Sequence, residues 1–152
     1  MLSRRDFLVG AGVAGVVTVA GRVTRAFAVA SQPSTPVNFD VPKGSCDCHT
    51  HILDPRRFPY VARRVSTPES ASVDEMRSLH RALHIDRVVI VQPSFYGSDD
   101  SCTLDAIHQL GSSARGIAVI DDRTSQSDLD QMHRRGIRGV RLNLETSGQV
   151  DP

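Results

Sequence analysis

The chain has 152 residues, of which 18 are basic and 17 acidic, and its formal net charge is +1. This balance excludes the strongly basic surface of a protein that binds nucleic acid or an anionic membrane through its charge. The length fits one small domain.

The first 30 residues have the form of a twin-arginine export signal. Arg4 and Arg5 precede a Phe-Leu pair, and the run at residues 8–21 carries no charge. This run of 14 residues is shorter than the ~20 that a membrane-spanning helix needs. Small residues follow at alternate positions over residues 26–30, as a signal peptidase requires. We therefore predict a signal peptide at residues 1–30 and a periplasmic protein, with an uncut membrane anchor as the alternative.

Residues 31–44 are predicted to be a solvated linker, because proline and small polar residues bury too little surface to become ordered. The signal segment holds four arginines and one aspartate, so the rest of the chain carries 14 basic and 16 acidic side chains. This mildly acidic remainder gives no reason to expect nucleic acid as a partner. The domain itself is expected at residues 45–152.

Within the domain, short apolar runs alternate with amphipathic ones. Ser72 is expected to cap the first helix, and Gly111 and Gly136 to end the second and third. The order β-α-β-α-β-α-β predicts an α/β fold with a parallel sheet. Strands are predicted at residues 45–51, 87–92, 115–120 and 139–144, and helices at residues 73–84, 103–110 and 128–135.

Four strands of this kind suit either a doubly wound sheet or half of a TIM (β/α)8 barrel, and composition does not separate the two. The sequence stops directly after the fourth predicted strand. We therefore expect the N-terminal half of a TIM barrel, with about four β/α units.

Asp47, His49 and His51 carry most of the chemical information. Side chains two residues apart on a strand point the same way, so all three are predicted to share one face at the end of the first strand. His49 and His51 are candidate ligands of one divalent metal ion such as Zn, or candidate catalytic groups that polarise a carbonyl without metal. Asp47 is expected to brace backbone or a ring nitrogen. A pair of hydrogen-bonded structural histidines is the alternative.

Four motifs follow one another along the domain: CDCHTHILD at residues 46–54, VIVQPSFYG at 89–97, RGIAVID at 115–121 and GIRGVRLN at 136–143. Together they resemble the amidohydrolase-2 branch of the amidohydrolase superfamily, and within it the 2-pyrone-4,6-dicarboxylate lactonase-like hydrolases. The resemblance covers residues 45–145. It implies a TIM barrel that hydrolyses a lactone, another cyclic ester or an amide of a small carboxylic acid.

The resemblance also implies roles for four residues. His49 and His51 match histidines that face the scissile carbonyl; these bind metal in many superfamily members, whereas the lactonase subgroup is expected to work without metal. Ser94 matches a serine that hydrogen-bonds a substrate carboxylate, and Arg141 an arginine that holds one. A planar guanidinium suits that role because it donates two parallel hydrogen bonds. The implied partner is a small substrate that bears a carboxylate.

The sequence departs from this family in two ways. Ser66 stands near the position of a substrate-binding tyrosine. The family's later strands carry further histidines and an aspartate that acts as general base, and these have no match here. The expected function is therefore that of a truncated hydrolase. The alternative is an inactive fragment, or a half-barrel that needs a partner, either as a homo-oligomer or with a complementing C-terminal half.

The other polar clusters are expected to be structural. His80 and His84 lie four residues apart on the first predicted helix and are taken as part of its solvated face. The aspartate pairs at residues 99–100 and 121–122 are expected to cap helices or form turns.

Overall fold

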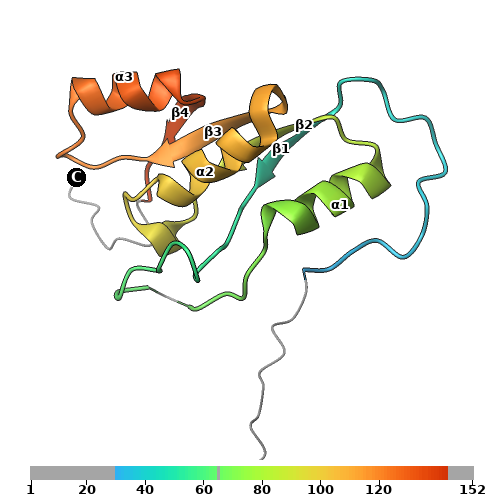
Figure 1. Ribbon diagram of the computed structural model, residues 1–152, viewed down its shortest axis with the longest axis horizontal. Helices are drawn as coiled ribbons and strands as arrows, with labels where there is room; N and C mark the ends of the chain where they lie inside the picture. The colour runs from blue at the N-terminus through green and yellow to red at the C-terminus, as the bar shows by residue number, and fades with distance from the viewer. Residues whose placement is uncertain (1–29, 65, 144–152) are drawn as a thin grey trace, which may run out of the picture.

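The computed structural model describes residues 30–64 and 66–143 (Figure 1). The predicted signal peptide, apart from Ala30, and the last residue of the predicted fourth strand lie outside these residues. The strands are β1 (Cys46–Thr50), β2 (Arg87–Val91), β3 (Ala114–Val119) and β4 (Ile137–Arg141), and the helices are α1 (Val73–Leu83), α2 (Ser101–Leu110) and α3 (Gln126–Arg134), with short 3-10 helices η1 (Ser94–Tyr96) and η2 (Gly111–Ser113).

The strands form one parallel sheet in the order β1-β2-β3-β4. Each strand therefore lies beside the next strand along the chain, as in a (β/α)8 barrel. A doubly wound sheet would instead reverse its strand order at a switch point. The order decides between the two architectures that the sequence left open, and the α/β half-barrel is confirmed.

The hydrophobic core lies between the sheet and its helices. Figure 1 shows α2 lying across β3, with α1 beside β1. Gly116 of β3 is necessary for this packing, because a Cβ there would lie 2.6 Å from the Cδ1 atoms of both Ile107 and Ile137. The side chains of the core come from all these layers and include Val73, Met76, Val88, Ile90, Leu104, Ala106, Ile107, Ala114, Ala118 and Ile137.

Two helices begin with a capping box. The Ser72 hydroxyl accepts a hydrogen bond from the amide of Glu75 at the start of α1, as predicted, and Ser125 and Asp128 make the same arrangement at the start of α3. In α3, Asp128 is thus the third helical residue, so the helix starts two residues before the predicted position. Both boxes satisfy backbone amides that have no partner within the helix.

The predicted bounds of the fourth strand are wrong at its start. β4 begins at Ile137, which pairs with Gly116 of β3. The register then shifts, because the next pair is Ile117 with Gly139. Arg138 is thus an extra residue in the ladder, and such a bulge breaks the alternation from which the strand was predicted.

Within residues 30–64 and 66–143, no helix combines the length and the apolar character that crossing a membrane requires.

Candidate active site

An irregularity in β1 decides which way Asp47 points. Asp47 pairs with Val88 and Thr50 pairs with Ile90, so three steps along β1 match two steps along β2. Directly paired residues of a parallel sheet project to the same side, and both β2 partners are buried in the core beneath the helices. Asp47 therefore faces the helix layer, whereas His51, next to Thr50, faces the opposite side. The prediction that Asp47 shares a face with the two histidines is wrong because of this bulge.

Asp47 instead joins α1 to the backbone of β1. Its Oδ2 lies 3.0 Å from Nε2 of His80, and its Oδ1 accepts a hydrogen bond of 3.1 Å from the amide of His49. The expected brace is confirmed, but the ring that it holds is that of His80. His80 is only 8% exposed, so its assignment to a solvated face is wrong, since it lies on the core side of α1 with Met76. His84 is exposed and ends α1 with a left-handed φ of 56°.

His51 is half-buried at the end of β1, and one of its ring nitrogens is occupied. Its Nδ1 lies 2.6 Å from the carbonyl oxygen of Val91. A carbonyl only accepts, so Nδ1 carries the proton and Nε2 offers a lone pair. Burial lowers the pKa of His51 below 6.5; the Val91 hydrogen bond opposes this, and the charges of His49 and Arg141 add to the lowering. Near neutral pH, Nε2 can therefore accept a proton or bind a metal ion, but it cannot donate to a carbonyl.

His49 is exposed and lies beside His51. Their ring centroids are 5.2 Å apart, with an edge-to-face angle of 79°. The part of the chain that the structure describes contains no group of three or more His, Cys, Asp or Glu side chains placed to hold a metal ion. Catalytic zinc sites use three protein ligands. The two imidazoles alone do not fit a complete metal centre.

Arg141 reaches the end of β2 from β4. Its Nη1 donates a hydrogen bond of 3.4 Å to the carbonyl oxygen of Gln92, the residue that follows the Val91 carbonyl bonded by His51. Arg141 pairs with Val119, while its neighbour Val140 pairs with buried Ala118. Arg141 therefore faces away from the helix layer, on the same side of the sheet as His51.

Ser94 is half-buried and opens η1, two residues beyond Gln92. The structure thus brings His49, His51, Ser94 and Arg141 to the carboxyl ends of β1, β2 and β4. This edge is where barrel enzymes build their active sites.

Gln92 is a residue of this region to which the sequence analysis gave no role. It is 0% exposed, and its Nε2 donates to the carbonyl oxygens of Gly97 at 2.9 Å and Asp99 at 3.0 Å. Its Oε1 accepts from the amide of Val119 at 2.9 Å. The signal in the sequence is a polar side chain that closes an uninterrupted apolar strand. Such a side chain is buried only where its polar atoms find partners.

The loop aspartates have mostly the structural roles predicted for them. Asp99 accepts a hydrogen bond from the amide of Ser101, and Asp121 from the amide of Arg123. The Arg123 guanidinium, with its amide, lowers the pKa of Asp121 to about 2. Asp100 is different: it precedes α2 without a capping hydrogen bond, because its ψ of 3° is not the extended backbone typical of that position. Burial raises the pKa of Asp100.

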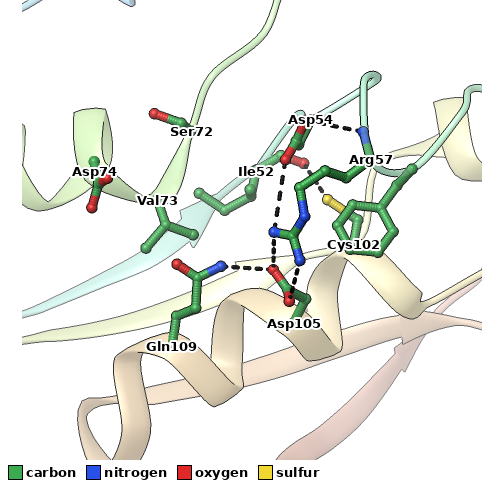
Figure 2. Close-up of a pocket in the computed structure, with 10 residues that line it drawn as sticks. Ile52, Asp54, Arg57, Ser72, Val73, Asp74, Cys102, Asp105 and Gln109 are labelled. Carbon is green, nitrogen blue, oxygen red and sulfur yellow. Dashed lines mark hydrogen bonds and ion pairs between the residues drawn. The ribbon is translucent and has the colours of Figure 1, made fainter.

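A separate cavity of about 160 Å³ lies between the N-terminal end of α1, α2 and the loop after β1. Figure 2 shows Arg57 reaching into it between Asp54 and Asp105. The Arg57 guanidinium donates two hydrogen bonds of 2.8 Å to Asp105, and Asp105 also accepts from Gln109. The Arg57, Asp105 and Gln109 side chains thus pair with one another and tie the loop to α2. None of the predicted site residues lines it.

Comparison with known proteins gives relatives that act on lactones. The chain is 37% identical over 115 residues to 2-pyrone-4,6-dicarboxylate hydrolase of Comamonas testosteroni. This match covers 75% of this chain and 37% of that protein. It is 35% identical over 122 residues to 4-sulfomuconolactone hydrolase of Rhizobium radiobacter. This match covers 78% of this chain and 41% of that protein.

A solved structure shares the fold. A protein from Acinetobacter baumannii, described as a probable 2-pyrone-4,6-dicarboxylic acid hydrolase with citric acid bound, superposes with a TM-score of 0.62 at 29% identity. The match covers 71% of this chain and 42% of that one.

The chain thus spans about two fifths of the length of these relatives. The match to a family described as Amidohydrolase extends over residues 46–152, which is well over half of the chain. The chain therefore belongs to the amidohydrolase family.

Proposed function

We propose that the chain acts in the hydrolysis of a small lactone that carries carboxylate groups. The observation that carries this proposal is that His51 and Arg141 hydrogen-bond to two consecutive main-chain carbonyls at the end of β2. His51 bonds to the carbonyl of Val91, and Arg141 bonds to that of Gln92. An imidazole with a free lone pair and a guanidinium then flank the same strand end. The names of the two lactone hydrolases and the citric acid bound to the Acinetobacter protein support an anionic substrate.

In this proposal, Arg141 and Ser94 bind a carboxylate of the substrate, Arg141 through charge-assisted hydrogen bonds. Nε2 of His51 accepts a hydrogen bond from the water that attacks the ring carbonyl, and the exposed His49 lies beside that carbonyl. Addition of water breaks the C–O bond of the ring, which leaves a carboxylic acid and a hydroxyl group. The lowered pKa of His51 keeps its lone pair available near neutral pH.

The test is to titrate the chain with 2-pyrone-4,6-dicarboxylate and to follow ring opening by the loss of ring absorbance. Arg141→Ala should weaken binding about 10–100-fold, because a hydrogen bond to a charged group contributes about 1.5–3 kcal/mol. Arg138→Ala is the matched control: Arg138 lies in the same strand, but it is exposed and donates to the carbonyl of His133. Equal losses in both variants would show that only overall charge matters and would contradict the assigned role.

A second candidate is a half-barrel that turns over substrate only with a partner, either another copy or a complementing half. Val140 and Leu142 are 51% and 63% exposed, and β4 lies at the edge of the sheet that the described residues form. Val140 pairs with buried Ala118, so it lies on the side of the sheet that helices cover. Binding of the pyrone without ring opening by the chain alone would favour this candidate.

We further propose that the chain is exported to the periplasm by the twin-arginine pathway, on the basis of Arg4, Arg5 and the short apolar run behind them. Changing both arginines to lysine should keep an uncut precursor in the cytoplasm. A trimmed product that still reached the periplasm would contradict this proposal.

A further inference from the structure

We infer that Gln92 is a positioning residue, which holds the Ser94 turn and Arg141 in a fixed arrangement; this inference rests on the proposed function. Gln92 is fully buried beyond the end of β2, with an exposed fraction of 0%. A buried amide adds rigidity only when its donors and acceptor are all satisfied. Its contacts satisfy both sides of the amide.

The amide nitrogen holds the turn that begins at Ser94. Nε2 donates to the carbonyl oxygens of Gly97 at 2.9 Å and Asp99 at 3.0 Å, three and five residues beyond Ser94. The other side of the turn is held by Val61, whose amide donates to the carbonyl of Phe95 at 2.9 Å. Val61 also packs closely against the turn, because a Cβ on Gly97 (φ +58°) would lie 3.2 Å from Cγ1 of Val61.

The oxygen atoms of Gln92 face the other half of the site. Oε1 accepts a hydrogen bond of 2.9 Å from the amide of Val119, the residue of β3 that pairs with Arg141. The main-chain oxygen of Gln92 accepts from Nη1 of Arg141 itself at 3.4 Å. One side chain thus links the Ser94 turn to the strand beside Arg141, and the same residue contacts Arg141 directly.

This linkage matters because Ser94 and Arg141 come from different strand ends, yet the proposal requires them to bind one carboxylate. Their relative position depends on groups that do not touch the substrate. A charge-assisted hydrogen bond weakens when its donor is displaced or turned, so a shift of either residue lowers the affinity for the carboxylate. Gln92 is therefore expected to affect affinity for the carboxylate substrate without contacting it.

The test compares Gln92→Glu with Ile107→Val in the whole chain. The glutamate keeps the length of the side chain and an acceptor for Val119, but it replaces the amide donor with an oxygen that faces the carbonyls of Gly97 and Asp99. Ile107 is a matched control, since it is buried (5%) in α2 and packs near Gly136 at the amino end of β4, at the opposite end of the sheet from the candidate site. Binding of 2-pyrone-4,6-dicarboxylate is measured per folded molecule, together with hydrogen exchange of the amides of residues 97–99 and 119.

We expect Gln92→Glu to weaken binding at least about tenfold, the loss that corresponds to one missing hydrogen bond to a charged group, and to speed exchange at residues 97–99, while the Val119 amide stays protected. Ile107→Val should bind like the wild type. If Gln92→Glu does not fold, Gly97→Ala displaces the same turn from the Val61 side and should weaken binding similarly.

Two results would overturn the inference. The first is wild-type affinity in Gln92→Glu, or in Gly97→Ala where only that variant folds. This result would overturn the inference and leave the proposed function intact. Failure of the wild-type chain to bind the pyrone would reject the proposed function, and the exchange data would then decide about Gln92. Unchanged exchange at residues 97–99 in the variant would overturn its positioning role, whereas faster exchange confined to that turn would support it.

Discussion

Burial of the His51 ring makes the stability of the chain depend on pH. The pKa of His51 is lower in the folded chain than its ordinary value of 6.5, chiefly because burial disfavours the charged ring. As the pH falls below 6.5, the unfolded chain binds a proton that the folded chain resists, so the free energy of unfolding decreases.

Urea denaturation should therefore give a lower free energy of unfolding at about pH 5.5 than at about pH 7.5. The difference should shrink in His51→Gln, whose side-chain amide does not titrate and can still donate to the Val91 carbonyl. The same pH dependence in both proteins would assign the effect to other groups.

Asp47 should matter for stability through His80. Asp47→Ala leaves the buried His80 ring without the carboxylate that it contacts at 3.0 Å, and an unsatisfied buried polar group costs about 1–3 kcal/mol. Asp74→Ala is a suitable control, because Asp74 is 88% exposed in its ion pair with Arg77, and exposed pairs contribute at most about 1 kcal/mol. Urea denaturation of both variants measures the difference. Equally small losses would show that the Asp47–His80 contact is unimportant.

The sequence located the chemically important residues more reliably than it oriented them. His49 in β1 and His51 just after it were found from their spacing. The face of Asp47 was not, because a bulge depends on how β1 pairs with β2 and has no local sequence signal. His80 was misassigned for a similar reason. A histidine suits both a solvated face and a buried contact, and only the partner across the helix–sheet interface distinguishes them.

Among the elements, α3 depends most on its own capping. No residue of α3 is fully buried and Met132 packs only partly against the core, while the capping box of Ser125 and Asp128 satisfies the first amides of the helix. Ser125→Ala should cost about 1 kcal/mol and should appear as faster hydrogen exchange within α3. Ser127→Ala, an exposed change in the first turn of the same helix, should have little effect. Unchanged exchange in Ser125→Ala would mean that other contacts hold this helix.

The order and type of the elements were predictable because β2 and β3 are apolar runs, and Ser72 and Gly111 mark the start of α1 and the end of α2. β4 was less regular. Its ladder with β3 starts at Ile137 and contains the extra residue Arg138, so the apolar positions do not alternate regularly. The position of Gln92 could be predicted, but its contacts could not, since its partners come from a later loop and from β3.

At the scale of the whole molecule, the sheet of the described residues has two edges, β1 and β4. An edge strand offers unpaired backbone groups to another strand. Beside the β4 edge, Val140 and Leu142 expose apolar side chains. Two copies related by a two-fold axis can pair β4 of one with β1 of the other at both edges, which gives eight strands in a closed ring.

We therefore predict that the chain forms a dimer or a larger assembly, because pairing with another copy satisfies the open backbone groups of both edge strands. Sedimentation at micromolar concentration should give a mass above that of one chain. The double variant Val140→Lys, Leu142→Lys should shift the equilibrium toward the monomer, since lysine on an edge strand opposes its pairing with another strand. Phe39 is 69% exposed in the loop before β1, so Phe39→Lys tests whether an added charge alone causes the shift. A wild-type chain that sediments as a well-folded monomer would show that these edges are stable in water without a partner.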